Sequence, residues 1–204
     1  LCRFLDNRGI DRAVMIGHSM GGKAIMQFAK GCPDRVASMI AVDIAPRAYH
    51  EMAAESRSAP NHAGMIDAML ELDLSKVESR EDADRMLSNS IGSERVRGFL
   101  LKNLRREKEG DFYWRINLQA LRNNLDRIMD GLDLDQVRKE GGITGFPVLF
   151  VSAERSDYIR AGDHALIREI FPTAEIVRIP GAGHWVHAEK PTLLVKNIKY
   201  FLGI

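Results

Sequence analysis

Two short apolar runs, residues 13–16 and 36–42, stand on either side of a segment with helical spacing, residues 21–30. Apolar runs of about four to eight residues between turn signals are typical of strands that are buried on both faces of a sheet. The first run stops at Gly17, and the helical segment stops at Gly31. A strand, a helix and a second strand in such close succession predict a parallel crossover unit, and therefore an α/β fold.

The same signals return near the end of the chain. Strands are expected at residues 147–151 and 174–179, and helices at residues 162–170 and 192–202. The predicted core is thus a parallel sheet of four strands, formed by residues 1–45 and 146–204.

The stretch between these two parts, residues 46–145, is richer in charge and in Met, and it has no run typical of a buried strand. Ser79, with Asp82 three residues later, precedes one helical pattern, and Ser93 precedes another. A short aromatic strand is expected at residues 111–116, followed by one further helix. Because structureless loops of this length are uncommon, we interpret the stretch as a helical lid inserted into the α/β core.

The composition excludes several classes of protein. Of 204 residues, 45% are hydrophobic and 28% are charged, which is typical of a globular chain. The net charge of +1 argues against nucleic acid as a partner, and no apolar run approaches the roughly 20 residues that cross a bilayer. Cys2 and Cys32 are too few for a disulfide framework, and no leader precedes them. We therefore expect a cytoplasmic protein without a membrane partner, in an oligomeric state that the sequence does not indicate.

A G-x-S-x-G motif, residues 17–21, lies at the junction of the first predicted strand and helix. Such a turn is so tight that side chains in place of Gly17 and Gly21 are expected to collide, and it lifts the Ser19 hydroxyl clear of the sheet. The backbone N–H of Met20 would then point to the place where an oxyanion forms. The motif predicts that Ser19 is a nucleophile, and the alternative is a structural turn with an exposed serine.

A histidine in a second motif is the candidate base for this serine. His184 lies in a Gly-rich loop, Gly181-Ala182-Gly183, between the last predicted strand and the last predicted helix. A loop at the carboxyl edge of the sheet can present an imidazole to Ser19. The order in the chain, serine first and histidine last, is that of the α/β-hydrolases.

An acidic residue should hold the imidazole of His184 in the correct tautomer. Asp157 follows the predicted strand at residues 147–151, and Asp43 follows the strand at residues 36–42. Both positions lie at the carboxyl ends of strands, so either carboxylate is within reach of one histidine. The residues alone leave both candidates open.

Other side chains near the motifs have weaker signals. His18, beside Ser19, is expected to orient the turn or to line the pocket, and Trp185, beside His184, is a pocket candidate. His187 suggests a metal pair, but we find no further ligand nearby that completes a set. We therefore expect neither a metal nor a cofactor.

Four stretches, GHSMGGKA, AVDIAP, FYWRINLQAL and GAGHWVHAEKP, together resemble the α/β-hydrolase superfamily, and more narrowly its YbfF-type esterase branch. The similarity covers essentially the whole chain. The resemblance implies strands five to eight of the α/β-hydrolase sheet, with the lid between strands six and seven. It also implies an esterase that acts on small acyl esters or thioesters without a metal or cofactor.

The resemblance bears on two open points. Members of this branch carry an aspartate in the block that matches AVDIAP, which favours Asp43 over Asp157. Members also begin with about 70 residues that have no counterpart here, which supply four strands and a second oxyanion donor. We therefore expect this sequence to be a fragment that is inactive alone, with the strand before Ser19 at a bare sheet edge.

The expected function is thus that of a serine hydrolase with a Ser-His-Asp triad. A serine nucleophile argues against dehalogenase and epoxide hydrolase chemistry, in which a carboxylate attacks. One alternative is a carbon–carbon bond hydrolase that uses the same triad. The other is a non-catalytic truncated hydrolase that binds or assembles through its edge strand.

Overall fold

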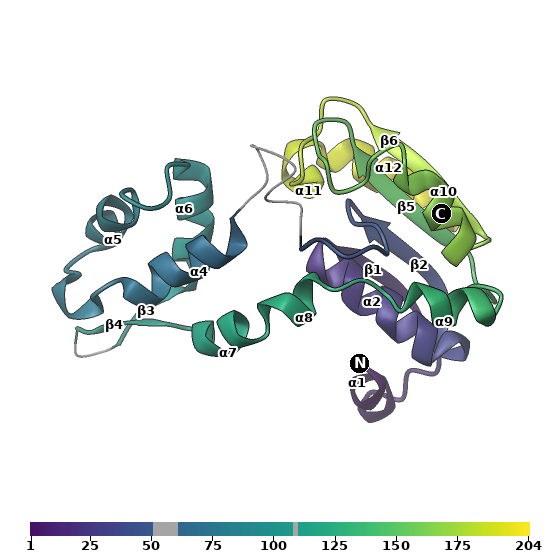
Figure 1. Cartoon of the computed structure of the whole chain (residues 1–204), viewed down its shortest axis with the longest axis horizontal. Coiled ribbons are helices and arrows are strands. Elements are labelled where there is room, and N and C mark those ends of the chain that lie inside the picture. The colour runs from purple at the N-terminus through teal and green to yellow at the C-terminus, as the bar shows by residue number, and fades with distance from the viewer. Residues whose placement is uncertain (51–60, 108–109) are drawn as a thin grey trace. The chain divides into compact units, whose positions relative to one another are not determined.

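A computed structural model describes residues 1–50, 61–107 and 110–204 of the chain (Figure 1). The chain divides into two compact units. The first unit comprises Leu1–Tyr49 and Asp130–Ile204, and the second unit comprises His50–Met129.

The first unit contains the α/β core. Its elements, in chain order, are α1 (Cys2–Asn7), β1 (Ala13–His18), α2 (Met20–Gly31), the 3-10 helix η1 (Pro33–Arg35), β2 (Val36–Val42), α9 (Leu134–Lys139), β5 (Val148–Ala153), α10 (Asp163–Ile170), β6 (Ala174–Ile179), α11 (Val186–Glu189) and α12 (Pro191–Leu202). The strands form one sheet in the order β1-β2-β5-β6, and every pair is parallel. The predicted parallel sheet of four strands is therefore confirmed.

The register brings the carboxyl ends of the strands to one edge of the sheet. His18, the last residue of β1, pairs with Val42, and Val42 pairs with Val151. The loops that follow β1, β2 and β5 therefore leave the sheet side by side. This edge is where the motif residues 17–21 and Asp43 come together.

Helices cover both faces of the sheet. Ile40 of β2 and Leu149 of β5 form one buried cluster with Leu194 of α12. Phe150, the next residue of β5, points to the opposite face because side chains alternate along a strand. There its ring contacts that of Phe171, which directly follows α10, at a centroid distance of 5.5 Å (Figure 1). Burial on both faces explains why the central strands are apolar throughout.

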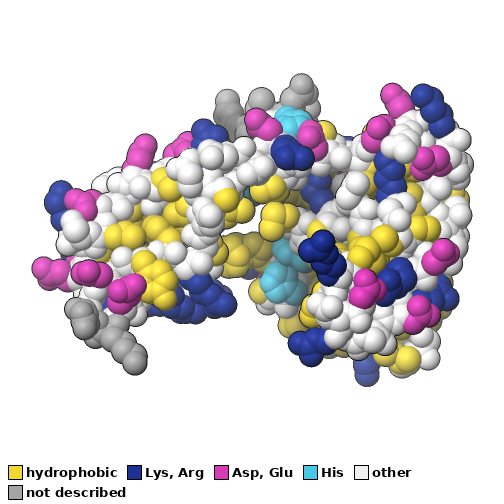
Figure 2. Space-filling model, turned by 90° about the horizontal axis from the view of Figure 1, so that it is seen from below, with side chains coloured by type: hydrophobic (Ala, Val, Ile, Leu, Met, Phe, Trp, Pro, Cys, Tyr) yellow, Lys and Arg dark blue, Asp and Glu magenta, His cyan; other side chains and the backbone are white. Residues whose placement is uncertain are grey.

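The strand that precedes Ser19 lies at an edge of the sheet, as expected. β1 has β2 as its one neighbour in the strand order. The side chains of Val14 and Ile16 in this strand are 44% and 54% exposed. Apolar side chains also remain at the surface elsewhere (Figure 2).

The second unit is mainly helical. Its described elements are α4 (His62–Glu71), the 3-10 helix η2 (Leu74–Lys76), α5 (Arg80–Leu87), α6 (Glu94–Leu100), the 3-10 helix η3 (Leu101–Asn103), β3 (Leu104–Arg106), β4 (Phe112–Trp114), α7 (Leu118–Asn123) and α8 (Leu125–Met129). Ser79 caps α5, as its hydroxyl accepts from the Asp82 N–H at 3.0 Å, and Ser93 caps α6 in the same way. Both predicted helix starts are confirmed.

Two details of this unit differ from the sequence predictions. The single helix expected after the aromatic strand is two helices, α7 and α8, with Asn124 between them. The sequence also does not predict β3, because Leu-Arg-Arg has no apolar run. β3 pairs antiparallel with β4, with Leu104 opposite Trp114, so a local hairpin stabilises a strand of low propensity.

The boundaries of the insertion also differ from the expected range of 46–145. Residues 130–145 pack with the first unit. Arg138 of α9 forms an ion pair with Glu169 of α10 at 2.8 Å, and the N–H of Ile143 donates to the carbonyl of Ile170 at 2.7 Å. The sequence does not reveal this because α9 is a short charged helix, like those of the insertion.

Candidate active site

The motif residues 17–21 form a sharp turn between β1 and α2. Ser19 has backbone angles of φ 54° and ψ −120°, which are rare for a residue with a side chain. The Ser19 N–H donates to the carbonyl of Val42 at 3.0 Å, and this bond ties the turn to β2. A strained conformation of this kind costs about 1–3 kcal/mol and persists only where surrounding contacts hold it.

The glycines of this turn have unequal roles. A Cβ on Gly17 would lie 2.4 Å from the backbone carbon of Gly21, and a Cβ on Gly22 would lie 2.3 Å from Cγ2 of Ile44. A Cβ on Gly21 would meet no described atom within 4 Å. The expectation that Gly17 excludes a side chain is therefore confirmed, whereas the same expectation for Gly21 is wrong. The close packing is at Gly22, where α2 lies against the segment after β2.

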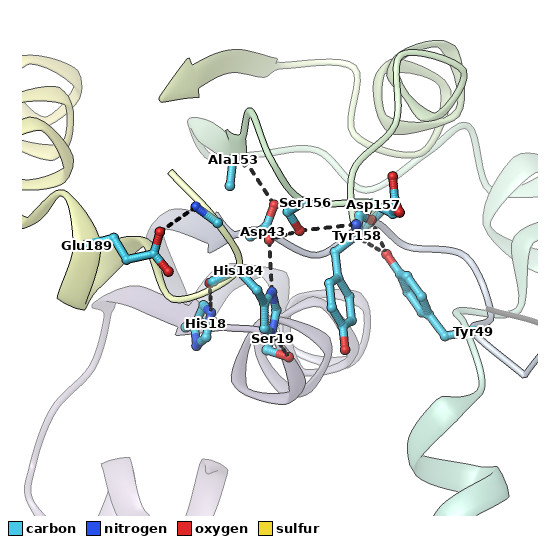
Figure 3. A network of polar contacts seen from close by, with 12 residues as sticks. His18, Ser19, Asp43, Tyr49, Ala153, Ser156, Asp157, Tyr158, His184 and Glu189 are labelled. Carbon is cyan, nitrogen blue, oxygen red and sulfur yellow. Dashed lines mark hydrogen bonds and ion pairs between the residues drawn. The ribbon is translucent and has the colours of Figure 1, made fainter. Parts of the chain in front are cut away.

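Ser19, His184 and Asp43 form one chain of hydrogen bonds (Figure 3). The Ser19 hydroxyl donates to Nε2 of His184, at an Oγ–Nε2 distance of 3.0 Å. Nδ1 of His184 donates to Oδ2 of Asp43 at 2.8 Å. The three residues come from loops after β1, β6 and β2, which the parallel sheet brings to one edge.

Asp43 is completely buried, and each carboxylate oxygen accepts hydrogen bonds. Oδ1 accepts from the backbone N–H of Ala153 at 3.0 Å, and Oδ2 accepts from the Ser156 hydroxyl as well as from His184. These donors offset the cost of burying a carboxylate. Asp157, the other sequence candidate, is exposed, and its backbone carbonyl accepts from Arg47. The carboxylate on His184 is therefore that of Asp43.

Met20 and His18 flank the serine on either side. Met20 is the first residue of α2, and backbone N–H groups in the first turn of a helix have no partner within the helix. Nε2 of His18 donates to the backbone carbonyl of His184 at 2.8 Å, so His18 holds the loop that carries the imidazole. Burial lowers the pKa of His18 below its ordinary value, and the nearby His184 and His187 contribute to the same effect.

Trp185 lies directly after His184, at the start of α11, and is half-buried. Its carbonyl accepts from the N–H groups of Ala188 and Glu189, both at 2.9 Å. The backbone of Trp185 therefore begins a turn of helix beside the imidazole. A role for its side chain in a pocket stays a prediction.

Tyr158 is a neighbour of the imidazole that the sequence analysis does not identify. Its ring stacks on that of His184, with centroids 3.9 Å apart and planes 17° from parallel. The Tyr49 hydroxyl donates to the carbonyl of Tyr158 at 2.6 Å and accepts from the Ala45 N–H at 2.7 Å. Burial, together with the charge of Asp43, raises the pKa of Tyr158 to about 12. No sequence motif marks this tyrosine, because the contact depends on the path of a loop.

Two cations lie over the ring of Tyr49. Nζ of Lys23 is 4.9 Å from the ring centroid, and Cζ of Arg47 is 4.2 Å from it. Burial lowers the pKa of Lys23 to about 8, an effect that the charge of Asp130 partly offsets. These contacts help to hold the Tyr49 hydroxyl against the Tyr158 backbone.

The glycine-rich loop before His184 is held by carboxylates at both ends. The Gly183 N–H donates to Glu189 of α11 at 2.7 Å, and the Gly181 N–H donates to Glu154 at 2.7 Å. Arg155 joins the two ends, since its guanidinium contacts both the Gly181 carbonyl at 2.9 Å and Glu189 at 3.3 Å. The imidazole therefore projects from a loop that is fixed through its backbone.

A metal centre or a membrane span would leave a recognisable pattern of side chains. Across residues 1–50, 61–107 and 110–204, no three His, Cys, Asp or Glu side chains converge as metal ligands would. In the same part of the chain, no helix is both long enough and apolar enough to cross a bilayer.

Comparison with known proteins agrees with this geometry. Residues 1–191 match the α/β hydrolase fold family. The chain is 35% identical to the sn-1-specific diacylglycerol lipase ABHD11 of Danio rerio, over 99% of this chain and 61% of that protein. It is 32% identical to esterase YbfF of Escherichia coli (strain K12), over 98% of this chain and 70% of that protein.

A solved structure is also similar. A marine microorganism esterase is 36% identical and superimposes with a TM-score of 0.87, over 98% of this chain and 74% of that one. The chain spans about three fifths of the length of several curated relatives. The family match and the esterase similarity together show that this chain belongs to the α/β-hydrolase family.

Proposed function

We propose that the full-length protein is a serine hydrolase that cleaves small acyl esters or thioesters through an acyl-enzyme intermediate. The observation that carries this proposal is the unbroken chain of hydrogen bonds from Ser19 through His184 to Asp43. A nucleophile in contact with a base, and a base oriented by a third group, is the arrangement that activates a hydroxyl.

In the first step, Oγ of Ser19 attacks the carbonyl carbon of the substrate while Nε2 of His184 takes the hydroxyl proton. Asp43 stabilises the imidazolium that forms. The carbonyl oxygen becomes an oxyanion, and the Met20 N–H donates to it at the positive end of α2. The bond to the leaving group then breaks, and His184 gives the proton to the departing oxygen or sulfur.

In the second step, water attacks the carbonyl carbon of the acyl-enzyme. His184 takes a proton from this water and returns it to Oγ of Ser19 as the carboxylic acid leaves. Because one imidazole serves as base and then as acid in each half of the reaction, its orientation is decisive. Tyr158, His18 and the loop contacts of Glu189 are proposed to maintain that orientation.

The names of the relatives favour oxygen esters within this substrate class. The lipase relative is named for sn-1-specific cleavage of diacylglycerol, and two others are named as esterases. We retain as proposals that the helical unit of residues 50–129 is the lid that selects the acyl group, and that the protein is cytoplasmic.

The test is a set of hydrolysis assays on the full-length protein, with Ser19→Ala as the matched control. The substrates are p-nitrophenyl acetate, butyrate and octanoate, the matching acyl-CoA thioesters, and a diacylglycerol. We expect steady hydrolysis of at least one short ester, and a loss of about 10⁴-fold or more in Ser19→Ala.

The remaining alternatives have distinct outcomes in this assay. A folded full-length protein that cleaves no ester or thioester contradicts the proposal and leaves a binding module or a carbon–carbon bond hydrolase. Hydrolysis that is unchanged in Ser19→Ala would place the chemistry at a different residue.

A further inference from the structure

The two cysteines of the chain meet in the folded protein. Cys2 lies in α1, and Cys32 directly follows α2. Their sulfur atoms are 3.0 Å apart, although the residues are 30 positions apart in the sequence. Both cysteines are free and half-buried, so a small reagent can reach them.

Contacts that do not involve sulfur hold the same two segments together. Arg35, three residues after Cys32, forms an ion pair with Asp6 of α1 at 2.9 Å. Its guanidinium also donates to the carbonyls of Ile10 at 2.9 Å and Asp11 at 2.6 Å. The closeness of the two sulfur atoms is therefore a property of the fold, and it persists whatever the oxidation state of the cysteines.

We propose that Cys2 and Cys32 are a site of reversible oxidation, at which a low-molecular-weight disulfide such as oxidised glutathione converts the two thiols to an intramolecular disulfide. A disulfide requires a sulfur–sulfur distance of about 2.05 Å, so the two atoms need to approach by about 1 Å. Movements of this size are available to half-buried side chains without a change of backbone.

The reaction proceeds by two exchanges. The Cys2 thiolate attacks one sulfur of the external disulfide, forms a mixed disulfide and releases one glutathione thiolate. The Cys32 thiolate then attacks the Cys2 sulfur, forms the Cys2–Cys32 bond and releases the second glutathione thiolate. Two protein thiols are oxidised, one external disulfide is reduced to two thiols, and the two protons go to the solvent or to the released thiolates.

The order of attack follows from the contact between the thiols. The hydrogen bond with Cys2 raises the pKa of the Cys32 thiol, so Cys32 keeps its proton while Cys2 is free. This cause disappears once Cys2 carries the glutathione group. Cys32 is then the resolving thiol, placed beside the bond that it breaks.

The bond would tie α1 to the carboxyl end of α2, the helix that begins directly after Ser19. It would close a loop of chain from residue 2 to residue 32. Closing such a loop stabilises a fold mainly by restricting the unfolded chain. We therefore expect the oxidised protein to unfold at a temperature several degrees higher than the reduced protein.

The test is peptide mapping of the native full-length protein after incubation with oxidised glutathione and alkylation of the remaining thiols. We expect a Cys2–Cys32 cross-linked peptide, a protein mass lower by two hydrogen atoms, and no lasting glutathione adduct on either residue. A reducing agent should reverse both the cross-link and the rise in unfolding temperature. Cys2→Ser should instead keep a stable glutathione adduct on Cys32 and show no thermal shift of this size.

Two results would overturn the proposal. One is a wild-type protein that accumulates glutathione on both cysteines without the cross-linked peptide. The other is a cross-link between two chains, which a mixture of isotopically light and heavy protein reveals as hybrid peptides. Because the wild-type protein alone gives these readouts, the test does not depend on the folding of a variant.

Discussion

The ring of Tyr158 stacks on the imidazole of His184, with centroids 3.9 Å apart and an interplanar angle of 17°. The backbone carbonyl of the same tyrosine accepts from the Tyr49 hydroxyl at 2.6 Å. The ring is thus supported from its own backbone, and it restricts rotation of the imidazole on the side away from His18. An imidazole that transfers protons to two partners in turn needs a fixed orientation.

Removal of this ring should slow catalysis without preventing substrate binding. Tyr158→Leu is expected to lower kcat by about 10–100-fold with a small change in KM, because a base displaced by about 1 Å costs up to about 10²-fold. Tyr158→Phe keeps the ring and should remain within a few-fold of wild type. Equal losses in the two variants would mean that the hydroxyl, and not the stacking, is what matters.

A matched pair of substitutions separates the two acidic candidates. Asp43→Asn replaces the carboxylate that accepts from Nδ1 of His184 and should lower kcat/KM by about 10⁴-fold, because the imidazolium loses its counter-charge. Asp157→Asn changes an exposed side chain and should have an effect of a few-fold at most. Steady-state kinetics on one ester measures both, and the reverse ranking would refute the assignment of Asp43.

Three glycine substitutions test the packing of the turn around Ser19. Gly17→Ala should lower the free energy of unfolding by about 3 kcal/mol, because its Cβ would overlap backbone atoms that cannot move independently. Gly22→Ala should also destabilise, since Ile44 is buried. Gly21→Ala should change the stability by less than about 1 kcal/mol. Urea unfolding of the three variants provides the comparison, and an equal cost at Gly21 would contradict the geometry.

The buried His18 should make stability depend on pH. Its pKa is lowered in the folded chain from 6.5, so the unfolded chain binds a proton at a higher pH than the folded chain does. The unfolded state therefore holds more protons below pH 6.5, and the free energy of unfolding falls as the pH decreases through that value. At higher pH this group has no effect on stability.

His18→Gln removes the titrating group and keeps a side-chain N–H donor for the carbonyl of His184. The variant should lose less stability than wild type between about pH 7.5 and about pH 5.5. His187→Gln, at an exposed position of the same cluster, is the control and should retain the wild-type dependence. A His18→Gln profile that coincides with that of wild type would show that the burial of His18 has no role in acid sensitivity.

The elements with strong periodic signals could be predicted from the sequence. The strands Val36–Val42 and Ala174–Ile179 match their predicted bounds, because both are apolar runs between turn signals. Ser19, His184 and the alternatives Asp43 and Asp157 were also identifiable, since motif and position at strand ends mark them. The choice between the two aspartates required the loop geometry, because both follow strands that end at the same sheet edge.

Other contacts at the site leave no trace in the sequence pattern. Tyr158 reaches His184 through a loop with no periodicity, and the pairing of Gly183 with Glu189 depends on how a glycine-rich loop meets a short helix. The sulfur contact of Cys2 with Cys32 arises in the same way, from the packing of two helices that are distant in the chain. Spacing alone does not encode such contacts, because tertiary packing decides them.

The most direct test of the account is the mass of the intact full-length protein before and after treatment with a fluorophosphonate, with Ser19→Ala alongside. Fluorophosphonates label serines whose hydroxyl a neighbouring base has activated. The account predicts one label per wild-type chain and none in Ser19→Ala. Labelling that persists in Ser19→Ala, or a folded wild-type protein that takes no label, would contradict the claim that His184 and Asp43 activate Ser19.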